Sequence, residues 1–225
     1  MKHLSFTQEF FLCAVNKKGK LSLVFSNDSA VCLVAGGIME LTKHGYIARD
    51  GKKKIMISKP WDNCLPYLTP MYEKIASYKR NPKVETILEA FALSMTNKNL
   101  NKLVDAFRSS LIDEGCMDEQ NNQGLLKEKT NYVPKPQLVT QIIEKIRAEF
   151  LEEGPMSENV LCLAALLMEG NLIKNYFSKV EVTKMKARLK EIRNSDEYAS
   201  VKDIFDYMDQ VAAMIVIVSA AGANS

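Results

Sequence analysis

Few side chains in this chain have the types and spacing that catalysis requires. Its two histidines are His3 and His44, which excludes a histidine-rich metal site and leaves one candidate base for a Ser-His-Asp arrangement. His44 comes just before Gly45 at the end of a helical pattern, where a cation interacts favourably with the helix dipole. The sequence lacks Cys-x-x-Cys, Gly-x-Ser-x-Gly and the glycine-rich phosphate motifs. We therefore expect no enzymatic activity, no metal and no cofactor.

The cysteines indicate a reducing compartment. They are five in number and widely separated: Cys13, Cys32, Cys64, Cys116 and Cys162. An odd set among apolar neighbours is typical of small buried hydrophobic residues, so we expect no disulfide. The longest apolar run, 211–218, is too short to span a bilayer, and no signal-peptide pattern is found. The sequence predicts a cytoplasmic protein, either soluble or peripheral on a membrane.

Positive charge that could bind an anionic partner is concentrated near the N-terminus. The net charge is only +3, but residues 1–60 hold ten Lys and Arg against four Asp and Glu. Lysines cluster at 17–20 and at 52–54, in two predicted turns. Such a surface suits phosphate headgroups or a nucleic-acid backbone. Two ordinary solvated turns are the simpler interpretation.

A basic amphipathic helix is predicted over 179–193. Its apolar residues recur at helical spacing, and lysines and arginines occupy the other positions. Helices of this kind can lie on anionic membranes. The apolar stripe is narrow and has no aromatic residue, which favours packing on the core with a solvated basic back.

The most suggestive binding feature is a pair of leucines after a polar turn. Gly124, Leu125 and Leu126 follow the polar run 118–123. Adjacent strand residues face opposite ways, so at least one leucine lacks cover by the core. An exposed apolar tip indicates a membrane, a protein partner or a second copy of the chain. Lys127 and Lys129 favour an anionic surface. The alternative is that both leucines pack under a neighbouring helix.

Three repeats of one pattern predict the elements that position these residues. A leucine, three further residues and a glycine occur at 41–45, 111–115 and 166–170. Each glycine is expected to end a helix in a left-handed conformation, which a residue without a side chain adopts most easily.

A β-hairpin is expected after each of the first two glycines. In the first, strands at 46–49 and 54–58 flank Asp50-Gly51, a strong hairpin signal. In the second, the polar run 118–123 is the expected turn and 124–130 the returning strand.

The remaining pattern predicts helices at about 6–15, 28–42, 67–79, 83–95, 98–114, 136–153, 158–169, 179–193 and 200–220. The second and seventh are nearly continuously apolar, and Ala35-Gly36-Gly37 leaves room for a close neighbour. The fold class expected is mainly α: a single-domain helical bundle over 1–225 with two small β-hairpins.

The collinear order of several segments resembles the Golgi phosphoprotein 3 family over about residues 4–220. The segments are 4–12, 18–20, 37–47, 111–115, Leu125-Leu126 before Pro134, and 163–167. The resemblance implies a mainly helical, non-enzymatic peripheral protein. It also implies recognition of phosphatidylinositol 4-phosphate and of cytosolic protein tails in the eukaryotic members, and a second hairpin that serves membrane contact or self-association.

The family's phosphoinositide pocket transfers poorly to this sequence. The resemblance places its tryptophan on Phe25, its helical arginine on Val34, and its two later basic residues on Asn101 and Val104. Three phosphate-contacting positions are therefore uncharged. Charge-assisted bonds to phosphate are about twice as strong as neutral ones, so stereospecific headgroup binding should be lost. This pattern favours a bacterial member of the family.

A looser anion site is expected near Phe25, Lys102 and Arg108.

The alternative function is that of a winged-helix-like nucleic-acid-binding regulator, with helix 28–42 in the groove and Lys52 to Lys54 in the wing. That helix has no basic or amide side chain before Lys43, so it cannot contact base edges or phosphates. We therefore expect an anionic phospholipid surface as the partner, with protein tails or self-association, and no nucleic acid.

Overall fold

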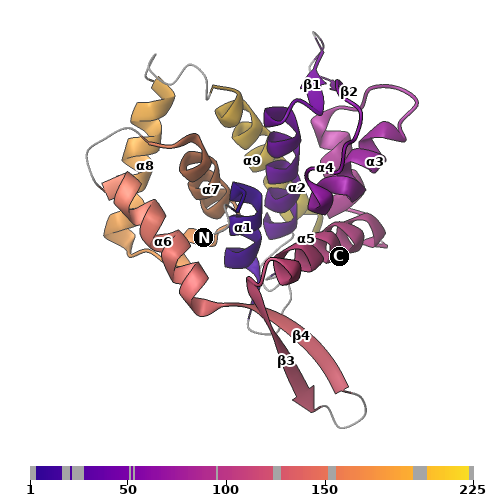
Figure 1. Cartoon of the computed structure of the whole chain (residues 1–225). Helices are drawn as coiled ribbons and strands as arrows, with labels where there is room; N and C mark the ends of the chain where they lie inside the picture. Colours follow the sequence, from indigo (N-terminus) through magenta and orange to yellow (C-terminus); the bar gives the residue numbers. More distant parts are fainter. Residues whose placement is uncertain are drawn as a thin grey trace.

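The computed structural model describes residues 4–16, 21, 28–50, 52, 54–94, 96–123, 128–151, 156–194 and 202–222. Its α-helices are α1 (Phe6–Ala14), α2 (Asp28–Lys43), α3 (Thr69–Ala76), α4 (Val84–Ala92), α5 (Lys98–Asp113), α6 (Pro136–Leu151), α7 (Glu158–Glu169), α8 (Lys179–Asn194) and α9 (Lys202–Gly222). The strands are β1 (Ile47–Arg49), β2 (Ile55–Ile57), β3 (Met117–Gln123) and β4 (Glu128–Pro134). Short 3₁₀ turns are η2 (Pro66–Leu68) and η3 (Ile173–Asn175). Figure 1 shows the arrangement.

The mainly helical fold with two β-hairpins is confirmed. Strands β1 and β2 form one antiparallel pair, and β3 and β4 form another. One cluster of buried apolar residues extends from Phe6 in α1 to Val211 in α9. The cysteines of the described segments are free, and all except Cys64 are buried, as expected of small hydrophobic residues.

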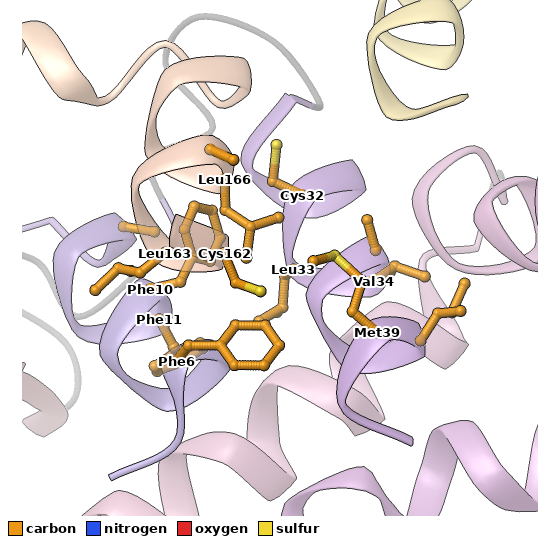
Figure 2. Close-up of a cluster of buried hydrophobic side chains, with 14 of the residues drawn as sticks. Phe6, Phe10, Phe11, Cys32, Leu33, Val34, Met39, Cys162, Leu163 and Leu166 are labelled. Carbon is orange, nitrogen blue, oxygen red and sulfur yellow. The ribbon is translucent and has the colours of Figure 1, made fainter. Parts of the chain in front are cut away.

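Helix α2 lies at the centre because its middle residues are small. Residues 29–41 are all buried. A Cβ added to Gly36 would lie 3.0 Å from Leu166 Cδ1 in α7 and 3.1 Å from Thr7 Cγ2 in α1. A Cβ on Gly37 would lie 2.6 Å from Met71 Cε in α3. Figure 2 shows α1 and α7 against α2, with Phe10, Leu33 and Leu166 among the packed side chains. The predicted close helix contact is confirmed.

One carboxylate is buried within this apolar helix. Glu40 accepts a hydrogen bond from the Tyr67 hydroxyl of η2, and the Tyr67 ring lies 5.0 Å from that of Phe107 in α5. Burial raises the pKa of Glu40 above its ordinary value, and the bond from Tyr67 counteracts part of that rise. The contact therefore joins α2 to η2 and α5 by a polar link as well as by packing.

Two of the three repeated patterns end as predicted, and the third does not. Gly45 has φ +72° and Gly115 has φ +69°. Gly170 has φ −71°, and Asn171, with φ 56°, takes the left-handed position instead. Apart from the Leu166 carbonyl oxygen of the preceding helical turn, at 3.1 Å, a Cβ at Gly170 would meet neighbouring elements at ordinary contact distances, 3.5 Å from Cys32 Sγ and 3.6 Å from Phe10 Cε2. The turn through positive φ occurs one residue later, at an asparagine, a residue type that tolerates this conformation.

The strand boundaries of the second hairpin were predicted wrongly. The polar run expected as the turn belongs to β3, and β4 is Glu128–Pro134 rather than 124–130. Pairing runs from Met117 with Pro134 to Gln123 with Glu128, and the connecting residues 124–127 lie outside the described segments. Polar residues form a strand here because the ribbon leaves the core and needs no alternating apolar face. The β-favouring Thr130, Tyr132 and Val133 provide the paired strand.

We predict that Gly36→Val destabilises the protein by about 1–3 kcal/mol, because the added carbons have no space between α1 and α7. Each kcal/mol should lower the melting temperature by about 2–4 °C in a chain of this size. The control is Ala76→Val at an exposed position of α3. Equal melting temperatures of both variants in a calorimetric scan would contradict the close crossing.

Candidate functional site

The second hairpin extends away from the helical body. Each of its strands has seven residues, which corresponds to a length of about 20 Å. At its base Met117 and Val133 are buried, and Tyr132 is half-buried against the core. Asp118, Glu119 and Gln120 are exposed. Figure 1 shows β3 and β4 below the body, with the start of β3 and the end of β4 next to the helices.

A tight corner sets the direction of this hairpin. At the end of α5, the Cys116 amide donates to the Leu111 carbonyl at 2.8 Å and the Gly115 amide to Ile112 at 2.8 Å. The Lys135 amide donates to the Cys116 carbonyl at 3.1 Å. The exit of α5 and the entry of α6 are thereby joined directly.

A buried glutamine ties this corner to α1. Gln8 Nε2 donates to Ser110 Oγ and to Glu114 Oε1, both at 3.1 Å. Its Oε1 accepts from the Ser5 amide at 3.0 Å, while Ser5 Oγ accepts from the Gln8 amide at 3.1 Å. Ser5 and Gln8 therefore form a capping box at the start of α1, and the glutamine also holds the last turn of α5.

A cavity of about 690 Å³ lies beside the corner, between α1 and α6. Leu138 and Ile142 contribute to its apolar wall. The side chain of Glu9 is 10% exposed and accepts hydrogen bonds from Lys145 Nζ at 2.5 and 2.7 Å. Burial raises the pKa of Glu9 above its ordinary value, and the bonds from Lys145 counteract part of that rise. The pair links α6 to α1 at the rim of the cavity.

Family comparison identifies the chain. A model of the Golgi phosphoprotein 3 (GPP34) family matches residues 7–222, nearly the whole chain. The chain belongs to this family. The resemblance inferred from the order of sequence segments is thereby confirmed. The search of curated proteins found no match.

The positions matched to the family's lipid pocket do not form a cationic cluster among the described residues. Val34 is 0% exposed within α2. On α5, Asn101 and Lys102 are exposed and Val104 is half-buried against the core. Phe25 lies outside the described residues, so its place beside them stays a prediction.

Arg108 lies on the same helix, α5, as Lys102. Its Nη1 forms an ion pair with Asp105 Oδ1 at 2.5 Å, and its side chain is 25% exposed. Part of its charge is therefore compensated within the protein. A looser anion site at Lys102 and Arg108 stays a prediction.

The hairpin residues expected to contact a partner fall mostly outside the described segments of this Golgi phosphoprotein 3 family member. Gly124, Leu125, Leu126 and Lys127 belong to the connection between β3 and β4. Lys129 lies in β4, paired with position 122 of β3. In sequence, these four residues thus stand between the two paired strands.

The sequence analysis missed the Glu9–Lys145 pair and the Gln8–Glu114 link. The available signal was the placement of charged and amide side chains inside the apolar pattern of α1, since such residues are buried only when paired. Their partners are more than 100 positions away in the chain, and no local pattern specifies them.

Among the described residues, no group of His, Cys, Asp and Glu could hold a metal ion.

We predict that Gln8→Ala loosens the hairpin corner. The change leaves Glu114 without its amide donor and removes the capping interaction, which together should cost about 1–3 kcal/mol. Faster hydrogen exchange at the amides of Cys116 and Lys135 is the expected readout. Gln141→Ala, on an exposed face of α6 beside the same cavity, is the control. Unchanged exchange at both amides in Gln8→Ala would contradict the link.

Proposed function

We propose that this Golgi phosphoprotein 3 family member is a non-enzymatic peripheral membrane or adaptor protein. It binds anionic phospholipid headgroups, partner proteins or both, and it self-associates through the second hairpin. The observation that carries the proposal is the extension of β3 and β4 away from the body with Leu125 and Leu126 in the connection. None of the described helices combines the length and apolar character needed to cross a bilayer.

The isolation of the hairpin supports a partner. Within the described segments, the β3–β4 sheet has two strands, and a two-stranded ribbon is at best marginally stable in water. Both of its outer edges carry backbone groups that another strand could pair with. A membrane or a second copy of the chain would stabilise the ribbon by covering its apolar end or its edges.

Charge along the hairpin favours an anionic surface at the far end. Asp118 and Glu119 lie near the base, whereas in sequence Lys127 belongs to the connection and Lys129 follows it in β4. An anionic bilayer attracts nearby lysines by roughly 1 kcal/mol each and repels the acidic base. Glu128 between the two lysines reduces but does not reverse this polarity.

The winged-helix alternative is disfavoured by the burial of α2. A recognition helix must expose one face to the groove, but residues 29–41 are all buried.

We predict that the double substitution Leu125→Ser/Leu126→Ser lowers affinity for vesicles containing phosphatidylserine by at least about tenfold, because each buried leucine contributes roughly 1.5–3 kcal/mol. Vesicle co-sedimentation and analytical ultracentrifugation are the measurements. Met56→Ser is the control, since Met56 is an exposed apolar residue, 39% accessible, on the first hairpin. Wild-type vesicle binding and oligomeric state in the folded double variant would refute the proposal.

Headgroup specificity should be weak. Without charged side chains at positions 34, 101 and 104, we predict less than about a twofold preference for phosphatidylinositol 4-phosphate over phosphatidylserine in vesicles of equal charge. Restoring charge with Asn101→Arg and Val104→Arg should raise that preference. A strong preference in the unmodified protein would show that other residues form the pocket.

A further inference from the structure

A second cavity, of about 460 Å³, lies between α7, α8 and α9. Its size is within the usual range for small-molecule sites, about 300–1,000 Å³. Figure 1 shows α8 at the edge of the body, away from β3 and β4. The cavity shares no lining residue with the hairpin or with the family-matched positions on α5.

The floor of this cavity is apolar and comes from all three helices. It is formed by Ala165 and Met168 of α7, Leu189 of α8, and Phe205 and Met208 of α9. Ala165 and Met208 are buried, and the other three are half-buried against the core. The apolar stripe predicted for residues 179–193 therefore packs inward, but its Leu189 also faces this open space.

The rim carries one more positive than negative charge. Arg193 is bound to Asp209 by two hydrogen bonds, one of them 3.0 Å from Nη1 to Oδ1. Lys186 interacts electrostatically with Glu169, whose pKa is raised above its ordinary value by burial and by Asp209. Lys190 has no carboxylate within ion-pair distance among the described residues. A single negative charge on a ligand would balance this rim.

We propose that the cavity binds an anionic amphiphile, a molecule with one negatively charged head and an apolar chain. The chain lies on the floor formed by Met168, Leu189 and Phe205, and the head lies at the rim beside Lys190. The ligand needs both the charged head and the apolar chain. An apolar floor alone would not select a charged ligand, and a lysine alone would not select a ligand with an apolar chain. Two sources share this chemistry: a free fatty acid and an anionic membrane lipid.

The test measures binding of sodium dodecanoate below its micelle concentration by isothermal titration. We expect saturable binding at one site. Octanoate should bind at least about tenfold more weakly because it buries fewer methylene groups, and dodecyltrimethylammonium should not bind at this site. Lys190→Gln should weaken dodecanoate binding about fivefold, as expected for an exposed ion pair. Absence of binding, or equal binding of the anionic and cationic amphiphiles, would overturn the proposal.

Lys184→Gln is the matched control, because it removes the same charge from an exposed position of α8 that does not line the cavity. Equal weakening of dodecanoate binding by both lysine substitutions would show that binding reflects the overall positive charge of α8, and it would overturn the proposal. Vesicles with and without phosphatidylglycerol separate the two sources. Weaker binding of Lys190→Gln to both dodecanoate and phosphatidylglycerol vesicles assigns a membrane lipid, and weaker binding to dodecanoate alone assigns a free fatty acid.

The hairpin variant Leu125→Ser/Leu126→Ser should retain dodecanoate binding. Vesicle binding by this hairpin variant therefore tests the proposed function, and its dodecanoate binding tests the cavity separately.

Discussion

The fold depends on the close approach of helices at Gly36. A Cβ at this position would meet side chains of α1 and α7 at once, so the absence of a side chain lets three helices share one centre. The packed interior tolerates little added volume. With α2 enclosed on all sides, its neighbours can present only their outer faces to solvent. Functional surfaces are therefore confined to helix exteriors, to clefts between peripheral helices and to the two hairpins.

The enclosed centre also explains why the few buried polar groups act as ties between elements. Glu40 joins α2 to η2 through Tyr67, Gln8 joins α1 to the end of α5, and Glu9 joins α1 to α6. Leaving any of these groups unpaired in an apolar interior is costly. Each tie thus fixes a relative position that apolar packing alone, which is non-directional, leaves less sharply defined.

Most helices could be predicted from the sequence because their apolar residues recur at helical spacing and their ends carry recognisable caps. Ser5 and Gln8 form such a cap, and Gly45 and Gly115 adopt the expected positive φ. Two of the predictions were wrong. The repeated pattern places Gly170 at the left-handed position after α7, but Asn171, which also tolerates positive φ, adopts it. The strands of the second hairpin were placed wrongly because a ribbon outside the core has no apolar alternation to reveal its register.

The candidate sites were predictable only in part for a related reason. Leu125 and Leu126 were found because apolar neighbours after a polar run stand out locally. The two cavities were missed because their linings come from helices distant in sequence, such as Glu9 with Lys145 and Met168 with Leu189.

Both ends of the second hairpin are bonded to the helical core. The hairpin leaves α5 through Gly115 and enters α6 at Lys135, and both ends are joined by the bond from the Lys135 amide to Cys116. The end of α5 is held to α1 by Gln8, and α6 is held to α1 by Lys145 and Glu9. Helix α1 in turn contacts Gly36 through Thr7. The base of the hairpin is therefore connected, through hydrogen bonds and the Glu9–Lys145 ion pair, to the helix that packs against Gly36.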